Sequence, residues 1–211
     1  MSTHVLHLIT TGKQTLEEVT ARLSHCPPNC IDALHIREKS RSAKEILDWY
    51  NKLRTALPGT AIYVNDRLDA AAAVAAPGVQ LGYTSLPPYL ARTIMPQGTR
   101  IGLSVHSLDE AARARAEGAD YILFGHIFAT GSKEGLAPRG LEALAAVVNA
   151  AEAPVIAIGG IEPGNVEDVL STGCAGIAVL SGILAHDDPA GQTLRYREKL
   201  DGSRYTPKIA F

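Results

Sequence analysis

The chain has 211 residues, of which 46% are hydrophobic and 20% are charged, and its formal net charge is −2. This length and apolar content suit one domain with a sizeable core, and we expect residues 1–211 to form it. The near balance of charge gives no reason to expect a nucleic acid or an anionic membrane surface as a partner.

The cysteines and the N-terminal residues indicate the compartment. Cys26, Cys30 and Cys174 are an odd and low number, which does not indicate a disulfide framework. Cys26 and Cys30 lack the further Cys or His ligands that a metal site needs, so we predict no metal. No basic start is followed by a long apolar run, and no segment approaches the ~18 apolar residues of a membrane span. We therefore predict a cytoplasmic protein.

In chain order, short β-branched runs alternate with longer segments rich in alanine, leucine and charged residues. The runs predict strands at residues 5–10, 31–36, 61–64, 79–81, 101–105, 121–124, 155–158 and 177–180. Helices are predicted at residues 15–23, 42–57, 70–76, 87–94, 107–117, 141–148, 163–170 and 189–200. The helix at 107–117 begins with the capping-box pattern of Ser107 and Glu110.

The order of these elements indicates the fold class. Near-continuous apolar strands that alternate with helices are typical of a parallel sheet buried on both faces. We expect an α/β fold, a single (β/α)8 TIM barrel, because that architecture accommodates this length. An open doubly wound sheet is the alternative. The final segment, SRYTPKIAF, is expected at the surface or in a subunit contact.

Polar residues and glycines follow several of the predicted strands. In a TIM barrel the carboxyl ends of the strands surround the active site, so these residues are the candidates. In chain order they are Arg37 and Lys39, Asn65, Ser104, His126, Gly159 and Gly160, and Ser181 and Gly182.

Two glycine-containing pairs predict a phosphate site. Gly159 and Gly160 follow the seventh strand, where glycine lets a backbone approach a ligand closely. Ser181 and Gly182 follow the eighth strand and open a short helix, whose first N–H groups attract anions. Two tight turns that simply use glycine are the alternative. The position after strands seven and eight favours a phosphate cradle.

Other candidates have weaker support from the residues alone. Arg37 and Lys39 either face an anion or form an ordinary solvated charge run. His126 has an ordinary pKa near neutrality, which suits a group that takes and gives a proton, but a lone histidine is more often structural. Residues 130–135, TGSKEG, form either a mobile lid or a plain surface loop.

Seven blocks resemble the thiamine phosphate synthase superfamily in the right order: LHIREK, VNDRLD, GVQLG, IGLSVHS, DYILFGHIFATGSK, PVIAIGGI and AGIAVLSGI. Within it the chain looks most like thiazole tautomerase, because of two departures from the synthase pattern. Ser85 stands where synthases have an acidic residue of a magnesium–diphosphate site, although Asp66 remains. His126 stands in GHIFAT where synthases usually have proline.

The resemblance implies an isomerase of thiamine biosynthesis that aromatises a carboxythiazole ethyl phosphate tautomer. His126 would be the catalytic residue that moves one proton. The thiazole phosphate carboxylate would be held by Arg37 or Lys39, by Asn65 and Ser104, and at its phosphate by Gly159, Gly160, Ser181 and Gly182. Such a reaction needs no cofactor and no metal, and we expect a homo-oligomer, a dimer.

Three alternatives stay open at this point. The first alternative is a thiamine phosphate synthase, which joins a pyrimidine pyrophosphate to a thiazole phosphate and uses magnesium. The second alternative is a regulatory protein that binds a thiazole phosphate without turning it over. The third alternative is another phosphate-binding barrel. The resemblance of the GHIF and VNDRLD blocks to the synthase superfamily argues against it.

Overall fold

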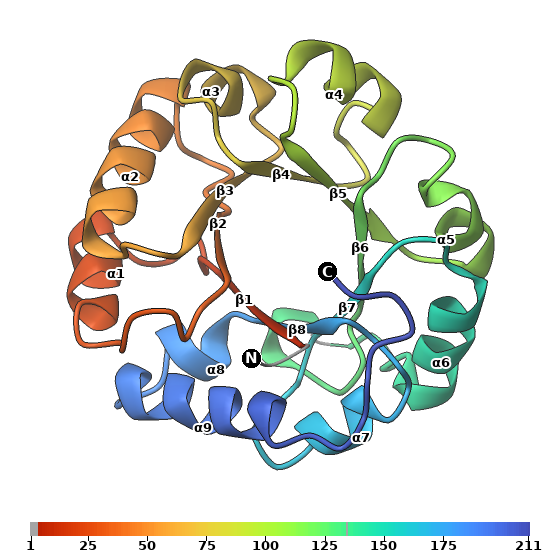
Figure 1. Cartoon of the computed structure of the whole chain (residues 1–211). Coiled ribbons are helices and arrows are strands. Elements are labelled where there is room, and N and C mark those ends of the chain that lie inside the picture. The colour runs from red at the N-terminus through yellow and green to blue at the C-terminus, as the bar shows by residue number, and fades with distance from the viewer. Residues whose placement is uncertain (1–3, 134) are drawn as a thin grey trace.

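The computed structural model describes residues 4–133 and 135–211. Its parallel strands close into one barrel in sequence order, with β1 hydrogen-bonded to both β2 and β8. The prediction of a single (β/α)8 TIM barrel is confirmed (Figure 1). The strands are Val5–Ile9 (β1), Ala33–Ile36 (β2), Ala61–Asn65 (β3), Gly78–Leu81 (β4), Arg100–Val105 (β5), Tyr121–Gly125 (β6), Val155–Ile158 (β7) and Gly176–Val179 (β8).

Helices surround the barrel (Figure 1). They are Leu16–Leu23 (α1), Ala43–Ala56 (α2), Leu68–Ala73 (α3), Pro88–Ile94 (α4), Leu108–Ala114 (α5), Gly140–Ala150 (α6), Val166–Leu170 (α7), Ser181–Leu184 (α8) and Pro189–Asp201 (α9), with a short 3-10 turn at Gly131–Lys133 (η1). No helix in the described ranges is long and apolar enough to cross a membrane.

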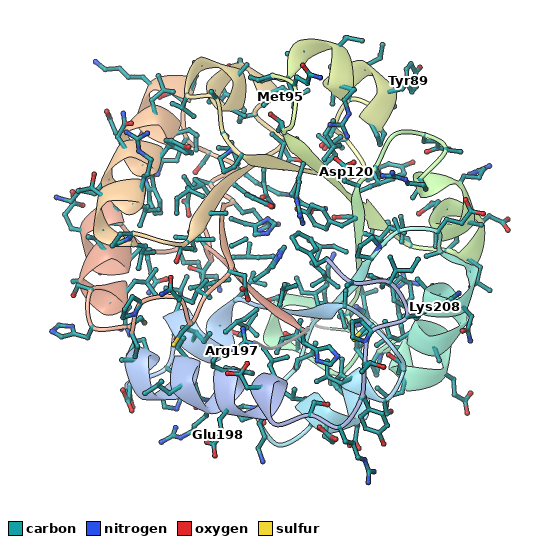
Figure 2. All side chains as sticks on the ribbon, viewed as in Figure 1. Tyr89, Met95, Asp120, Arg197, Glu198 and Lys208 are labelled. Carbon is teal, nitrogen blue, oxygen red and sulfur yellow. The ribbon has the colours of Figure 1, made fainter. Side chains whose placement is uncertain are left out.

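Each strand has two buried faces, as the apolar runs predict. Alternate residues such as Leu6, Leu8 and Leu34 pack outward against helix residues such as Val19 and Leu53. The intervening residues point into the barrel, where they form a second cluster of Ile9, Ala33, Tyr63, Tyr121, Leu123, Ile156 and Ala178. Figure 2 shows side chains filling the centre of the barrel.

Two glycines make room for the large rings inside the barrel. A Cβ atom on Gly78 would lie 2.5 Å from the ring of Tyr63. A Cβ atom on Gly102 would lie 2.1 Å from the ring of Tyr121. Both glycines are on strands next to the tyrosine that they face, so the small residue and the large one are packed as a pair.

Side-chain caps begin the helices at the predicted places. Thr15 and Ser42 form complete capping boxes before α1 and α2. Ser107 accepts a hydrogen bond from the Glu110 amide at 3.2 Å, but Glu110 Oε2 accepts from the His106 amide at 2.6 Å. At α5 the Glu110 carboxylate therefore accepts from the amide of His106, one residue before the Ser107 amide that a capping box would use.

Several predicted helix bounds differ from the structure, most clearly the start of α7. The α7 helix begins at Val166, because Asn165 caps a turn in which it accepts from the Glu162 amide at 2.9 Å and donates to Gly160 O at 3.1 Å. Residues 203–211 alternate between half-buried and exposed, so the C-terminal segment stays largely at the surface while its last ring packs against the barrel interior. Phe211 lies against His7 and Tyr121 with ring centroids 4.9 and 5.2 Å apart, and Figure 1 shows the C-terminus within the outline of the barrel.

Candidate functional site

The candidate residues lie at the carboxyl ends of the strands, on two sides of the barrel. Arg37, Lys39 and Asn65 follow or end β2 and β3. Gly159, Gly160, Ser181 and Gly182 follow β7 and β8. Because the closed barrel has the order β1 to β8, β3 is four strands away from β7 in either direction. Asn65 therefore lies opposite the turn of Gly159 and Gly160, whereas Arg37 and Lys39, which follow β2, are two strands away from Ser181 and Gly182.

The backbone after β7 requires glycine. Gly159 and Gly160 have φ values of +102° and +64°, a region that residues with a side chain rarely adopt. A Cβ atom on Gly159 would lie 2.4 Å from His126 Cβ, and one on Gly160 would lie 2.5 Å from Ala129 O. These glycines therefore allow the β7 turn to pack directly on the segment that follows β6. Phosphate binding there stays a prediction.

The helix α8 begins at Ser181, as predicted, and continues through Gly182 to Leu184. Tyr196 of α9 lies directly behind Gly182, where an added Cβ atom would be 2.5 Å from its hydroxyl oxygen. The same hydroxyl donates to Ile161 O at 2.8 Å, and its burial raises the pKa of Tyr196 above the ordinary value. One tyrosine therefore joins the segments after β7 and β8.

His126 follows β6 and is half-buried beside the β7 turn. Its ring Nε2 is 3.2 Å from Leu136 O, so the imidazole contacts the loop that connects η1 to α6. Arg139 holds the base of this loop, donating from Nε to Gly125 O at 3.1 Å and from Nη1 to His106 O at 2.9 Å. The predicted loop at residues 130–135 includes residue 134, which is outside the described residues.

The sequence did not single out Arg139. Its guanidinium also lies 5.4 Å from the centroid of the Phe124 ring, which suits a cation–π contact. The hydrogen-bond partners of its guanidinium are at least 14 residues away along the chain, and no local pattern marks such a contact.

Asn65 ends β3 and is held from inside the barrel. Its Oδ1 is 3.2 Å from Nδ1 of His35, and Nε2 of the same ring is 2.9 Å from Nδ1 of His7. Both histidines are fully buried. Burial lowers the pKa of His35 to about 4 and that of His7 well below its ordinary value. Both rings are therefore neutral near pH 7, and no role was predicted for either of them.

Ser104 makes a similar contact on β5. Its hydroxyl accepts a hydrogen bond from Gln80 Nε2 at 3.1 Å, and Gln80 is buried on β4. The side chains of Asn65 and Ser104 are therefore each held by a buried polar residue of a neighbouring strand.

Ser85 explains how the missing acidic residue is replaced. Its hydroxyl donates to Asp66 Oδ1 at 2.5 Å and accepts from the Gly82 amide at 2.8 Å. Ser85 therefore orients the Asp66 carboxylate. Within residues 4–133 and 135–211, no three or more His, Cys, Asp or Glu side chains are grouped as metal ligands.

Arg37 and Lys39 flank a buried acid. Glu38 between them is only 5% exposed, and its carboxylate lies 4.0 Å from Arg41 Nε. The Arg37 amide donates to Thr10 Oγ1 at 2.8 Å, which ties this turn to the end of β1. Arg37 is half-buried and Lys39 is exposed. Their contact with an anionic substrate stays a prediction.

Comparison with known proteins supports the superfamily resemblance. Residues 6–183 match the family model described as thiamine monophosphate synthase. A thiamine-phosphate synthase of Moorella thermoacetica is 38% identical over 92% of this chain and 91% of the relative. One of Chlorobium phaeobacteroides is 41% identical over 81% of this chain and 84% of the relative. The structure of a thiamine phosphate pyrophosphorylase from Pyrococcus furiosus is 35% identical, with a TM-score of 0.81, over 94% of this chain and 96% of that one.

These findings contradict the expected thiazole tautomerase. The relatives are named as synthases, which are transferases and not isomerases, and they match most of the chain. The tautomerase hypothesis rested on two positions, Ser85 and His126. Ser85 retains contact with the Asp66 carboxylate, and His126 hydrogen-bonds to a loop carbonyl. Neither contact outweighs a similarity that extends over 92% of the chain.

The matched residues include all eight strands and the beginning of α8, so they contain both sides of the candidate site. On this evidence, the chain belongs to the thiamine monophosphate synthase family.

Proposed function

We propose that this protein is a thiamine-phosphate synthase, a transferase that joins a pyrimidine pyrophosphate to a thiazole phosphate and releases pyrophosphate. The observation that carries the proposal is the similarity to proteins of that name, 38% to 41% identical over most of the chain. The arrangement of the site gives independent support, because a reaction of two anionic substrates needs two places for their phosphates.

The thiazole phosphate is assigned to the β7–β8 side. Its phosphate would lie against the turn of Gly159 and Gly160 and the first residues of α8, Ser181 and Gly182. N–H groups at a helix start and a glycine turn suit a phosphate group. His126 packs against Gly159 on this side, where its imidazole is within reach of a bound thiazole ring.

The pyrimidine pyrophosphate is assigned to the β2–β3 side. Arg37 and Lys39 supply positive charge for a diphosphate there, and Asn65, together with Ser104 of β5, supplies polar groups for the ring. Opposite placement of the substrates would let their reacting atoms meet above the barrel centre, and holding two reactants in this way accounts for much of an enzyme's rate.

The metal that the synthase reaction implies has one clear protein ligand. Mg²⁺ is usually held by one or two carboxylates together with substrate phosphates and water. Asp66 supplies one carboxylate, and Ser85 fixes its orientation. This donor set fits a magnesium ion that binds together with the diphosphate, and the ion would neutralise charge on the departing pyrophosphate. The proposal replaces the expectation of a reaction without metal.

The chemistry assigns His126 a binding role. Bond formation at the lone pair of a thiazole nitrogen does not require removal of a proton beforehand. His126 is therefore proposed as a group that contacts the thiazole substrate. The prediction that it is a catalytic acid–base has no support in the synthase reaction.

Magnesium titration of activity tests the diphosphate side. The variant Asp66→Asn should lose at least about a hundredfold in kcat/KM, since it removes the proposed carboxylate ligand. Asp69→Asn is the matched control, because Asp69 lies on α3 with a 60% exposed side chain paired to Arg67. Equal activity of the two variants would contradict the assignment of Asp66.

The assembly and the compartment remain predictions. A homodimer and a cytoplasmic location were expected from the sequence, and sedimentation of the purified chain and fractionation of cells would test them.

A further inference from the structure

The interior of the barrel contains polar side chains, of which His7, His35 and Gln80 have no part in the substrate assignments. They lie on strands β1 to β5, namely His7, His35, Asn65, Gln80 and Ser104. The facing strands β6 to β8 fill the same space with Tyr121, Leu123, Ile156 and Ala178, which pack with Ile9, Ala33 and Tyr63 of β1 to β3. Burying a polar group costs free energy, so an interior that only needed filling would favour apolar side chains on both sides.

His7, His35 and Asn65 form one continuous chain of hydrogen bonds across three neighbouring strands. The distances are 2.9 Å from His7 Nδ1 to His35 Nε2 and 3.2 Å from His35 Nδ1 to Asn65 Oδ1. The strand register places His35 opposite Ile9, two residues beyond His7, so the chain rises toward the carboxyl ends of the strands. It starts inside the barrel and ends at Asn65.

Counting protons gives this chain a direction. Each neutral imidazole carries one N–H, and an amide oxygen accepts hydrogen bonds only. With Asn65 Oδ1 as the acceptor toward His35, this geometry assigns the proton of His35 to Nδ1. Its Nε2 then accepts, and the proton of His7 is on Nδ1. Because Asn65 Oδ1 accepts from His35, the NH2 group of Asn65 points away from His35.

We propose that His7 and His35 are positioning residues that hold the Asn65 carboxamide with its NH2 group toward the barrel opening. There Asn65 acts as an oriented donor to an oxygen or ring nitrogen of the substrate on the β2–β3 side. The part that concerns the substrate rests on the proposed synthase function. The orientation of Asn65 is a property of the free protein.

The surroundings of His7 hold the first ring in place. The rings of Tyr63, Tyr121 and Phe211 lie edge-on to it, with centroids 5.9, 5.7 and 4.9 Å away. Among the described residues, His7 Nε2 has no hydrogen-bond partner, whereas Nδ1 is paired with His35. The His7 imidazole therefore joins the hydrogen bonds to His35 and Asn65 only through its Nδ1 atom.

Nuclear magnetic resonance of the 15N-labelled full chain tests the direction without any activity. Long-range 1H–15N spectra distinguish a protonated from an unprotonated ring nitrogen. Near neutral pH, His7 and His35 should both carry their proton on Nδ1. A proton on Nε2 of either ring would overturn the proposal, because Asn65 would then have to present its oxygen to the opening.

Kinetics test the consequence for the substrate. His35→Phe should raise KM for the pyrimidine pyrophosphate roughly tenfold with kcat within about twofold, as expected for the loss of one oriented hydrogen bond. His35→Asn should restore most of the affinity, because its amide nitrogen occupies the place of Nδ1. Tyr63→Phe is the control, since Tyr63 is a neighbouring interior ring that takes no part in the hydrogen bonds between His7, His35 and Asn65. Its KM should stay within about twofold of that of the unaltered protein.

The outcomes separate this proposal from the proposed function. If the unaltered protein forms no thiamine phosphate, the synthase assignment fails and the ring-nitrogen spectra still decide the orientation of Asn65. If the protein is active but His35→Phe and His35→Asn have the same KM as the unaltered chain, the positioning role is wrong. Thermal unfolding of each variant establishes that the comparison is made on folded protein.

Discussion

The two halves of the barrel interior are filled by different chemistry. Strands β6 to β8 contribute Tyr121, Leu123, Ile156 and Ala178, and the buried Tyr121 hydroxyl has no hydrogen-bond partner among the described residues. Strands β1 to β5 contribute the two buried histidines and Gln80, which hold the side chains of Asn65 and Ser104. One half of the interior is therefore mainly apolar packing, while the other contains polar side chains that contact Asn65 and Ser104.

The largest expected effect lies in the apolar half. Ile156→Ala should lower the free energy of unfolding by about 2–5 kcal/mol, because Ile156 is fully buried and the change leaves a cavity. Ile156→Val is the matched control and should cost about 0.5–1.5 kcal/mol. Urea unfolding measures both. His7→Phe should cost less than Ile156→Ala, and the reverse order would break the comparison between the halves.

Next in size is the backbone at the turn after β7. Gly159→Ala should lower the free energy of unfolding by about 2–4 kcal/mol, because it adds a Cβ atom at φ +102° and 2.4 Å from His126 Cβ. Gly164→Ala provides the control, since nothing lies within 4 Å of a Cβ atom there. Thermal unfolding measures the two. Equal stability of the variants would show that the β7 turn is not packed against His126.

The polar half should make stability depend on pH. Burial lowers the pKa of His35 to about 4, whereas in the unfolded chain it titrates near its ordinary value of about 6.5. Between these values the unfolded state binds more protons, so stability should fall as pH decreases from about 6.5 toward about 4. The loss at pH 5 should be roughly 2 kcal/mol. Above about 6.5 this contribution does not change.

The double variant His7→Phe/His35→Phe sharpens that measurement. It lacks both buried imidazoles, so its stability should change less between pH 7 and pH 5 than that of the unaltered chain. Urea unfolding at the two pH values gives the comparison. The same slope in both proteins would mean that other groups cause the pH dependence.

The smallest expected effect is at Phe211. Its ring lies 4.2 Å from the Arg100 guanidinium and edge-on to His7 and Tyr121. Phe211→Leu keeps an apolar group but removes the ring, and it should cost about 1 kcal/mol of stability. An unchanged midpoint in urea would show that the ring adds nothing to the closure of the barrel interior.

The sequence predicted the fold well because the signals are local. Each β-branched run became a strand within about two residues of its predicted bounds, since strands buried on both faces need apolar residues throughout. The start of α7 was placed too early, because the turn at Asn165 depends on a side chain that reaches back to Gly160 O. The packing of the Phe211 ring against the barrel interior depends on partners such as Arg100, far away in sequence.

The site was predicted in part for the same reason. The rule that strand ends surround the active site located His126, Asn65 and the glycine turn at the barrel opening, where the structure has them. It could not find the contact of His7 with His35, whose residues are 28 positions apart. The function was misjudged because two motif positions were weighed above a resemblance that covered the whole chain.

One measurement tests the proposed synthase directly. The purified chain is mixed with the pyrimidine pyrophosphate, the thiazole phosphate and magnesium, and phosphorus resonance follows both phosphorylated products. The account predicts thiamine phosphate and pyrophosphate in equal amounts, with no reaction when magnesium is withheld. Folded protein that binds the thiazole phosphate but forms neither product would contradict it.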